Sequence, residues 1–207
     1  NIGKIRDLSD LESLCDLTVR SLDELIDFQR YPVKAAEIAT KARRSLGVGF
    51  IGLAHYLAKN GVNYGDEKAW KLVHDLTEAF QYNLIKATVQ VAKEKGACEY
   101  SDNTKYSHGI LPIDTYKKDV DEIVPNELHY DWETLRNDVK TYGVRNSTLS
   151  AQMPSESSSV VCNATNGIEP PRDYLSVKKS KKGPLKQIVP SYNTCLLYTS
   201  PSPRDNG

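Results

Sequence analysis

One stretch of the chain, residues 144 to 171, constrains the fold more than any other. It reads V-R-N-S-T-L-S-A-Q-M-P-S-E-S-S-S-V-V-C-N-A-T-N-G-I-E-P-P. The apolar and β-branched residues before Pro154 predict a short strand, and the serines that follow, with Val160 and Val161 behind them, predict a short helix. This arrangement directs the amino end of a helix at whatever lies beyond the strand.

The residues between strand and helix, 154 to 158, form what we call the serine turn. The first amides of a helix lack intrahelical acceptors and carry partial positive charge, so a phosphate placed there accepts several hydrogen bonds. Serine hydroxyls would add further donors without bulk. The alternative is that the serines only cap the helix. The candidate ligand-binding residues are Pro154, Ser155, Glu156, Ser157 and Ser158.

A spaced pattern leads into this turn. It is W-x2-L-x7-G-V-R-N-x3-S-A-x2-P, made by Trp132, Leu135, Gly143, Val144, Arg145, Asn146, Ser150, Ala151 and Pro154. The pattern closely resembles the signature of the large, catalytic chain of ribonucleotide reductase. Three more segments resemble the class I, aerobic bacterial and phage form of that family, in the same order: R-R-S-L-G-V-G at 43–49, G-I-L-P-I-D-T-Y-K-K-D at 109–119 and N-A-T-N-G-I-E-P-P-R at 163–172. The resemblance covers residues 1–192.

The resemblance implies an α/β fold. The large chain of that family is a ten-stranded α/β barrel of two five-stranded halves, and residues 1–192 resemble most of the second half. Such an incomplete barrel domain is expected to leave strand edges unpaired. Residues 193–207 depart from the family pattern and resemble translated sequencing-adapter read-through, so we expect a non-native tail there.

The resemblance also implies a function. The family reduces ribonucleoside diphosphates at the 2′ carbon, with a radical from a metal-bearing small chain and electrons from thioredoxin or glutaredoxin, and a second large chain is a further partner. The serine turn matches the family's phosphate-binding turn. Glu156 would repel a phosphate, so we expect it to favour the helix dipole or to contact an amide or hydroxyl.

No catalytic residue is predicted within the chain itself. By resemblance, the redox cysteines precede Asn1, where an N-x-C-x-E loop is expected, so the chain is interpreted as a fragment that is inactive in isolation. Cys15, Cys98, Cys162 and Cys195 inherit no such role. Their wide spacing matches no metal site or secreted disulfide framework, and it favours reduced thiols in the cytoplasm.

Net charge and apolar run length exclude some classes of binding partner. The 207 residues carry 27 basic and 27 acidic side chains, so no net field attracts nucleic acid or an anionic membrane. No apolar run approaches the roughly 20 residues that cross a bilayer, and because Asn1 leads directly into a helical pattern, no signal peptide is expected in these residues. Neither the lysines between 178 and 186 nor the histidines show a binding pattern. We interpret the lysines as a solvated hairpin tip, and the histidines as surface or capping residues rather than metal ligands.

Hydrophobic periodicity predicts the helices. They are expected from a Ser9–Glu12 capping box to Phe28, then at 33–44, at 51–60 ending at Gly61, at 67–95 after an Asp66 cap, and at 132–142 between Asp131 and Gly143. A strand is expected at 45–50, whose Gly47 and Gly49 would let a helix pack closely, and two strands at 174–179 and 185–190. The irregular residues 97–129 are expected to wrap a neighbouring element.

Two other function classes stay open from the residues alone. One is an unrelated phosphate-ligand enzyme, which would show an acid–base pair near Ser157. The other is a non-catalytic α/β interaction module, which would leave a wide apolar stripe exposed beside the helix at 67–95.

Overall fold

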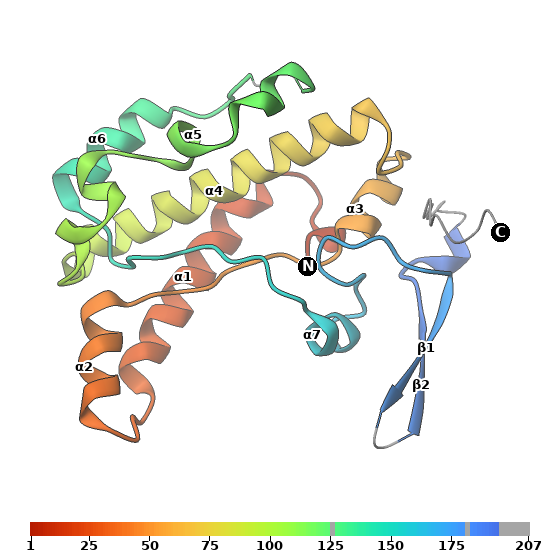
Figure 1. Ribbon diagram of the computed structural model, residues 1–207, viewed down its shortest axis with the longest axis horizontal. Helices are drawn as coiled ribbons and strands as arrows, with labels where there is room; N and C mark the ends of the chain where they lie inside the picture. The colour runs from red at the N-terminus through yellow and green to blue at the C-terminus, as the bar shows by residue number, and fades with distance from the viewer. Residues whose placement is uncertain (125–126, 181–182, 195–207) are drawn as a thin grey trace. The chain divides into compact units, whose positions relative to one another are not determined.

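The computed structural model describes residues 1–124, 127–180 and 183–194 (Figure 1). The chain divides into two compact units. The helical unit comprises Asp7–Val48 and His74–Ala151, and the hairpin unit comprises Asn1–Arg6, Gly49–Val73 and the described residues from Gln152 onward. Each unit is therefore assembled from segments that are distant in sequence.

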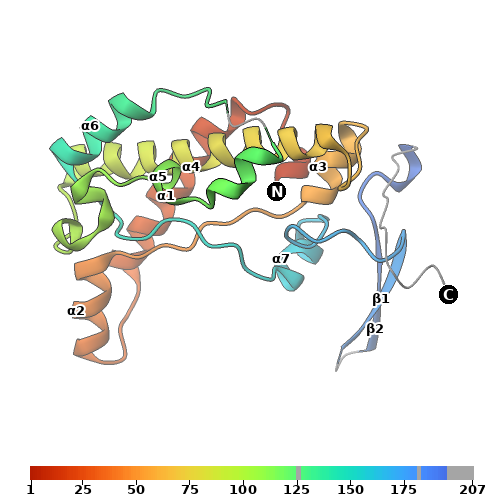
Figure 2. The ribbon, with the colours of Figure 1, turned by 45° about the horizontal axis from the view of Figure 1, so that its top comes forward.

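Helix α4, Glu67–Lys95, is the longest element, and its residues from His74 onward are the central support of the helical unit. Helix α1, Asp10–Phe28, is joined to it by ion pairs in matching order along both helices, Glu12 with Lys86 at 2.6 Å and Arg20 with Glu94 at 2.6 Å. Helix α6, Trp132–Tyr142, lies along another side of α4 (Figure 2). The α4 helix is thus covered from two directions.

This arrangement buries apolar residues spaced three or four apart on each helix. They include Leu11, Cys15, Val19 and Ile26 of α1, Leu76, Phe80, Leu84 and Val91 of α4, and Leu135 and Val139 of α6. The periodicity of each helix therefore matches its buried face. Helix α2, Lys34–Arg43, buries only Ala42 and ends at Arg44 in the left-handed conformation, with φ of 48°.

Two extended segments of the helical unit lie side by side and parallel. The amides of Leu46 and Val48 donate to the carbonyls of Thr148 and Leu149, both at 2.8 Å, and the amide of Ala151 donates to Val48 at 3.0 Å. The expected strand at 45–50 is therefore represented by one bridge between Val48 and Ser150. The expected role of its glycine is wrong. A Cβ on Gly47 would meet the Ala151 side chain at 3.4 Å, so Gly47 accommodates the neighbouring extended segment, not a helix.

Residues 97–124 wrap α4 and α6 as short turns. They form 3₁₀ turns at Ser101–Asn103, Lys105–His108 and Lys118–Glu122, with the four-residue helix α5 at Pro112–Thr115 between the last two. Arg136 of α6 holds this segment through Asp114 at 2.6 Å. The predicted wrapping is thus made by ion pairing to a regular helix.

The hairpin unit combines short helices with a two-stranded antiparallel sheet. Strand β1, Leu175–Ser180, pairs with β2, Gly183–Ile188, with Leu175 opposite Ile188. A 3₁₀ turn at Ile2–Lys4, helix α3 at Leu53–Lys59, helix α7 at Glu156–Val161 and a 3₁₀ turn at Tyr192–Thr194 complete the unit. Ala54 and Ala58 pack with Val189, beside the partly buried Tyr64.

Most predicted helix bounds agree with the structure to within two residues, but two further local predictions are wrong. Ser9 makes no side-chain cap bond, because its hydroxyl and its amide both donate to Asp7 Oδ1. His55 is not a surface residue, since it is 6% exposed, with its Nε2 3.2 Å from the Ser191 hydroxyl. The mixed helix and strand content agrees with an α/β chain, and the half-barrel stays a prediction.

Candidate functional site

The serine turn lies in the hairpin unit, and its last three residues are the first three of the short helix α7. Proline ends the extended segment because it lacks an amide donor and disfavours helical geometry in the residue before it. Ser155 takes the N-cap position, with φ of −121° and ψ of 38°, and the Ser159 amide donates to its carbonyl at 2.8 Å. Helix α7 therefore begins where the sequence predicts a helix.

Ser155 connects the serine turn to Asn166 and Gly167 by hydrogen bonds. Its amide and hydroxyl both donate to Asn166 Oδ1 at 3.1 Å, and its Oγ accepts from the Gly167 amide at 2.9 Å. Ser155 is only 5% exposed to solvent, so its side chain lies in the protein interior. Gly167 has φ of 47°, a left-handed value that glycine adopts without strain. The buried serine is thus a joint between the turn and the loop at 163–167.

This geometry corrects the capping alternative for one residue. Ser155 occupies the N-cap but makes no side-chain cap bond, because its hydroxyl points to Asn166 and Gly167 instead. The Ser158 hydroxyl donates to the Ser155 carbonyl at 3.2 Å. For Ser155 and Ser158, capping through side-chain oxygens is therefore not what the structure describes.

The outward face of the turn consists of Pro154, Glu156, Ser157 and Ser158, all exposed. As the first three residues of α7, Glu156, Ser157 and Ser158 have amides that no intrahelical carbonyl can reach. Within the described part of the chain, none of these three amides has a hydrogen-bond acceptor. The turn therefore presents donors to solvent, together with one carboxylate.

Sequence reasoning missed the supports of the motifs. Asn166 was recognised only as part of N-A-T-N-G, yet it orients Ser155 and is itself held by Glu169, with Nδ2 3.0 Å from Oε2. In the helical unit, Arg44, Arg145 and Asn146 of two other motifs meet the buried Asp23. The only sequence signal of these roles is that the three residues belong to the quoted motifs. Burial of an arginine produces no periodic pattern in the sequence.

The described residues do not favour the two other function classes. The apolar face of α4 is covered, with Leu76 and Leu84 each 0% exposed, so no wide stripe is open beside that helix. The hydroxyls of Ser155, Ser158 and Ser159, which flank Ser157, donate to Asn166 and to backbone carbonyls and not to an acid–base pair. In residues 1–124, 127–180 and 183–194, no group of three or more acidic, histidine or cysteine side chains could hold a metal ion. None of the described helices is both long and apolar enough to cross a bilayer.

Comparison with known proteins gives one consistent result. Residues 1–200 match the family described as ribonucleotide reductase, barrel domain. The chain is 58% identical over 207 residues to the ribonucleoside-diphosphate reductase subunit alpha of Haemophilus influenzae, covering 98% of this chain and 27% of that protein. Identity is 58% over 167 residues to subunit alpha of reductase 1 from Escherichia coli, covering 81% and 22% respectively. To the subunit alpha of phage T4 it is 51% over 186 residues, covering 90% and 24%. The chain thus spans about a quarter of the length of these curated relatives.

Proposed function

The chain belongs to the ribonucleotide reductase barrel domain family, and from this premise we propose that it supplies the substrate-phosphate-binding turn of a ribonucleoside-diphosphate reductase large chain. The observation that carries the proposal is the outward face of the serine turn. The first three residues of α7 leave their amides without acceptors in the described part of the chain, and Ser157 and Ser158 are exposed. An anion placed there would accept several of these hydrogen bonds at once.

The turn residues differ in burial and in hydrogen bonding, and this difference supports ligand binding rather than helix capping. Ser155 is buried and fixes the backbone through Asn166 and Gly167, so the turn keeps its shape without a ligand. Such preorganisation reduces the entropy lost when a diphosphate binds. Pro154 restricts the approach of the chain to the turn. The Ser157 hydroxyl is then available to a phosphate, and the Ser158 hydroxyl can donate to one after rotating away from the Ser155 carbonyl.

Glu156 has a separate role in this proposal. Its exposed carboxylate sits in the first turn of α7, where a negative charge is stabilised by the helix dipole. The same charge repels a diphosphate, so we assign Glu156 to the helix end, or to an amide or hydroxyl of the nucleotide, and not to the phosphate oxygens.

The proposed parent reaction is reduction of a ribonucleoside diphosphate to the deoxyribonucleoside diphosphate in the cytoplasm. A metal-bearing small chain would supply the radical, thioredoxin or glutaredoxin the electrons, and a second large chain would complete the assembly. The redox cysteines of the proposed parent would lie outside this chain. The parallel pairing of residues 46–48 with 148–151 supports the further proposal that the chain forms part of the second half of a ten-stranded α/β barrel.

The test replaces Ser157 and Ser158 together by alanine in a complete large chain that carries this sequence. Each hydrogen bond to a charged group contributes about 1.5–3 kcal/mol, so affinity for a ribonucleoside diphosphate should weaken at least about tenfold by calorimetry. Ser13→Ala, an exposed serine of α1, is the matched control and should bind as the parent does.

Thermal melting without nucleotide separates binding from folding. A lost helix cap would lower stability by about 1 kcal/mol, and this contribution is measured independently of the ligand. If the double variant binds diphosphate as tightly as the parent, the assignment of the serine turn to the substrate phosphate is wrong.

A further inference from the structure

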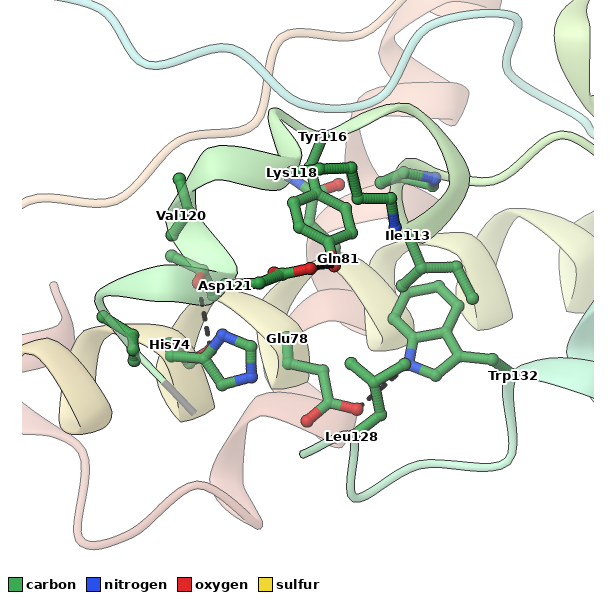
Figure 3. Close-up of a pocket in the computed structure, with 13 residues that line it drawn as sticks. His74, Glu78, Gln81, Ile113, Tyr116, Lys118, Val120, Asp121, Leu128 and Trp132 are labelled. Carbon is green, nitrogen blue, oxygen red and sulfur yellow. Dashed lines mark hydrogen bonds between the residues drawn. The ribbon is translucent and has the colours of Figure 1, made fainter. Parts of the chain in front are cut away.

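A pocket of about 440 Å³ lies in the helical unit, far along the chain from the serine turn. It is lined by one side of α4 and by residues from 112–124 and 128–132 (Figure 3). Small-molecule sites in proteins commonly have volumes of roughly 300–1,000 Å³. The volume therefore suits a ligand of the size of a metabolite fragment.

The walls of this pocket are mainly apolar. Ile113, Val120, Val124 and Leu128 line it together with the rings of Tyr116 and Trp132. A ligand with an apolar body would bury its surface against them, which is the main source of affinity in such sites.

One acid in the pocket already has its hydrogen bonds. Glu78 is 6% exposed, and its Oε1 accepts from the amides of His129 at 2.9 Å and Tyr130 at 3.2 Å, and from Trp132 Nε1 at 3.0 Å. Figure 3 shows the contact between Glu78 and the Trp132 indole. Glu78 therefore builds the pocket by fastening its wall to α4.

A second acid in the pocket, Asp121, has a hydrogen bond to only one of its two oxygens among the described residues. Asp121 Oδ2 accepts from the Tyr116 hydroxyl at 2.8 Å, whereas its Oδ1 is buried and has no hydrogen-bond partner in the described part of the chain. A buried acceptor without a donor loses its hydration and receives nothing in return. The Asp121 carboxylate, which belongs to the pocket lining, thus has a formal negative charge and one oxygen that accepts no hydrogen bond from the described residues.

The neighbouring ring already holds a cation. Lys118 Nζ lies 4.0 Å from the centroid of the Tyr116 ring, within the range in which an ammonium is attracted to an aromatic face. The same ring is fixed by its hydroxyl on Asp121. Carboxylate and ring face together favour a positive charge and disfavour an anion at this place.

We propose that this pocket binds a small organic ammonium ion with an apolar body, whose positive charge pairs with the Asp121 carboxylate while its body packs against Ile113, Leu128 and Trp132. The Lys118 ammonium competes for the Tyr116 face in the empty pocket. This site shares no residue with the serine turn and does not depend on the proposed function.

Trp132 is a built-in reporter for the test. The chain has two tryptophans, so Trp70→Phe leaves the pocket indole as the single source of tryptophan fluorescence. Phenethylamine, neutral 2-phenylethanol and anionic 3-phenylpropionate are titrated into this variant of the whole 207-residue chain. The amine should change the Trp132 signal saturably, and both other probes should bind at least about tenfold more weakly, as expected for loss of a charged hydrogen bond.

Three substitutions in the Trp70→Phe background assign the effect. Asp121→Asn should weaken the amine at least about tenfold, and Lys118→Met should strengthen it by about threefold through removal of the competing cation. Asp119→Asn is the matched control, because Asp119 is 75% exposed and pairs with Lys117 outside the pocket lining, and it should leave the affinity unchanged. Circular dichroism checks that each variant is folded.

The proposal is overturned if no probe gives saturable binding, in which case water satisfies Asp121. It is also overturned if the alcohol binds as tightly as the amine, or if a folded Asp121→Asn variant keeps the parent affinity.

Discussion

The carboxylate of Asp23 lies 2.7 Å from Nε of Arg44, and the two side chains are only 1% and 5% exposed. Arg145 Nε approaches the other carboxylate oxygen at 3.2 Å, and Asn146 Nδ2 donates to the first at 3.0 Å. Asn146 also donates to the Arg44 carbonyl at 3.0 Å. One acid of α1 thus joins the end of α2 to the segment that leads into the parallel pair, and two of the recognised motifs meet at this buried charge.

Loss of the Asp23 charge should destabilise the helical unit strongly. Asp23→Asn puts an amide where Arg145 needs an acceptor and leaves buried guanidinium charge undercompensated. Breaking a buried pair in this way typically costs about 3–5 kcal/mol, so we expect the free energy of unfolding in urea to fall by about 3 kcal/mol. Asp16→Asn removes an exposed carboxylate that pairs with Arg20, and it should change stability by less than about 1 kcal/mol. Equal effects of the two substitutions would contradict the assignment.

The same cluster predicts an acid-dependent stability. Burial alone would raise the pKa of Asp23, but hydrogen bonds and charge from Arg44, with help from Arg145, outweigh burial and hold the pKa below its ordinary value. A depressed folded-state pKa stabilises the protein above the unfolded-state pKa of about 3.9, and this contribution is lost as the pH falls through the folded-state value. Urea unfolding from pH 7 to pH 3 should therefore show a gap between the parent and Asp23→Asn that is constant above about pH 5 and narrows below pH 4. A gap that is independent of pH would show that the lost contact is not ionic.

Helices could be predicted from sequence here because their signals are local. Gly61, Gly96 and Gly143 all adopt positive φ just after helices whose apolar period had already fixed their extent. Asp131 caps α6 as expected, accepting from the Thr134 amide at 3.0 Å.

What sequence could not predict depends on distant partners. Asp23 looks like an ordinary helix-surface acid until Arg44, 21 residues on, and Asn146, 123 residues on, are placed beside it. The Ser9 cap failed for the opposite reason, because Asp7, two residues away, competes for the same donors. The serine turn was located correctly as a helix start, while the burial of Ser155 required knowledge of Asn166.

Glu78 should be indispensable for the wall formed by residues 128–132. Glu78→Gln keeps the shape but replaces one acceptor oxygen by a donor, where the amides of His129 and Tyr130 and the Trp132 indole already point inward. Each hydrogen bond to a charged group contributes about 1.5–3 kcal/mol, so stability should fall by at least about 2 kcal/mol. Trp132 emission in a Trp70→Phe background should shift toward that of an exposed indole. Glu67→Gln, an exposed change in the first turn of α4, is the control and should leave the emission unchanged.

The purified chain should show no reductase activity by itself. In the proposed parent enzyme, the redox cysteines would lie outside this chain, and the structure buries Cys15 and Cys98. The assay supplies a ribonucleoside diphosphate, a matching small chain and reduced thioredoxin, and measures the deoxyribonucleotide formed. Product above the background of a Cys15→Ser, Cys98→Ser, Cys162→Ser variant would assign a redox role to one of these thiols.

The three described cysteines should differ sharply in reactivity. Burial raises the pKa of Cys15 to about 12, and burial also raises that of Cys98, so both remain protonated thiols near neutral pH. Cys162 is exposed just beyond α7. Because the thiolate is the reacting species, a disulfide reagent at pH 8 should modify Cys162 first and the buried pair at least about a hundredfold more slowly. The experiment uses Cys195→Ser, since Cys195 lies outside the described residues.

Two controls test whether the different rates of cysteine modification are caused by the fold. In guanidinium chloride all three thiols should react at one common rate, because the difference resides in the fold. Adding Cys162→Ala should abolish the fast phase alone. A fast phase that persists in that variant would mean that Cys15 or Cys98 opens to solvent readily, and that the packing of α1 against α4, or of residues 97–101 against Val144, is much weaker than its burial indicates.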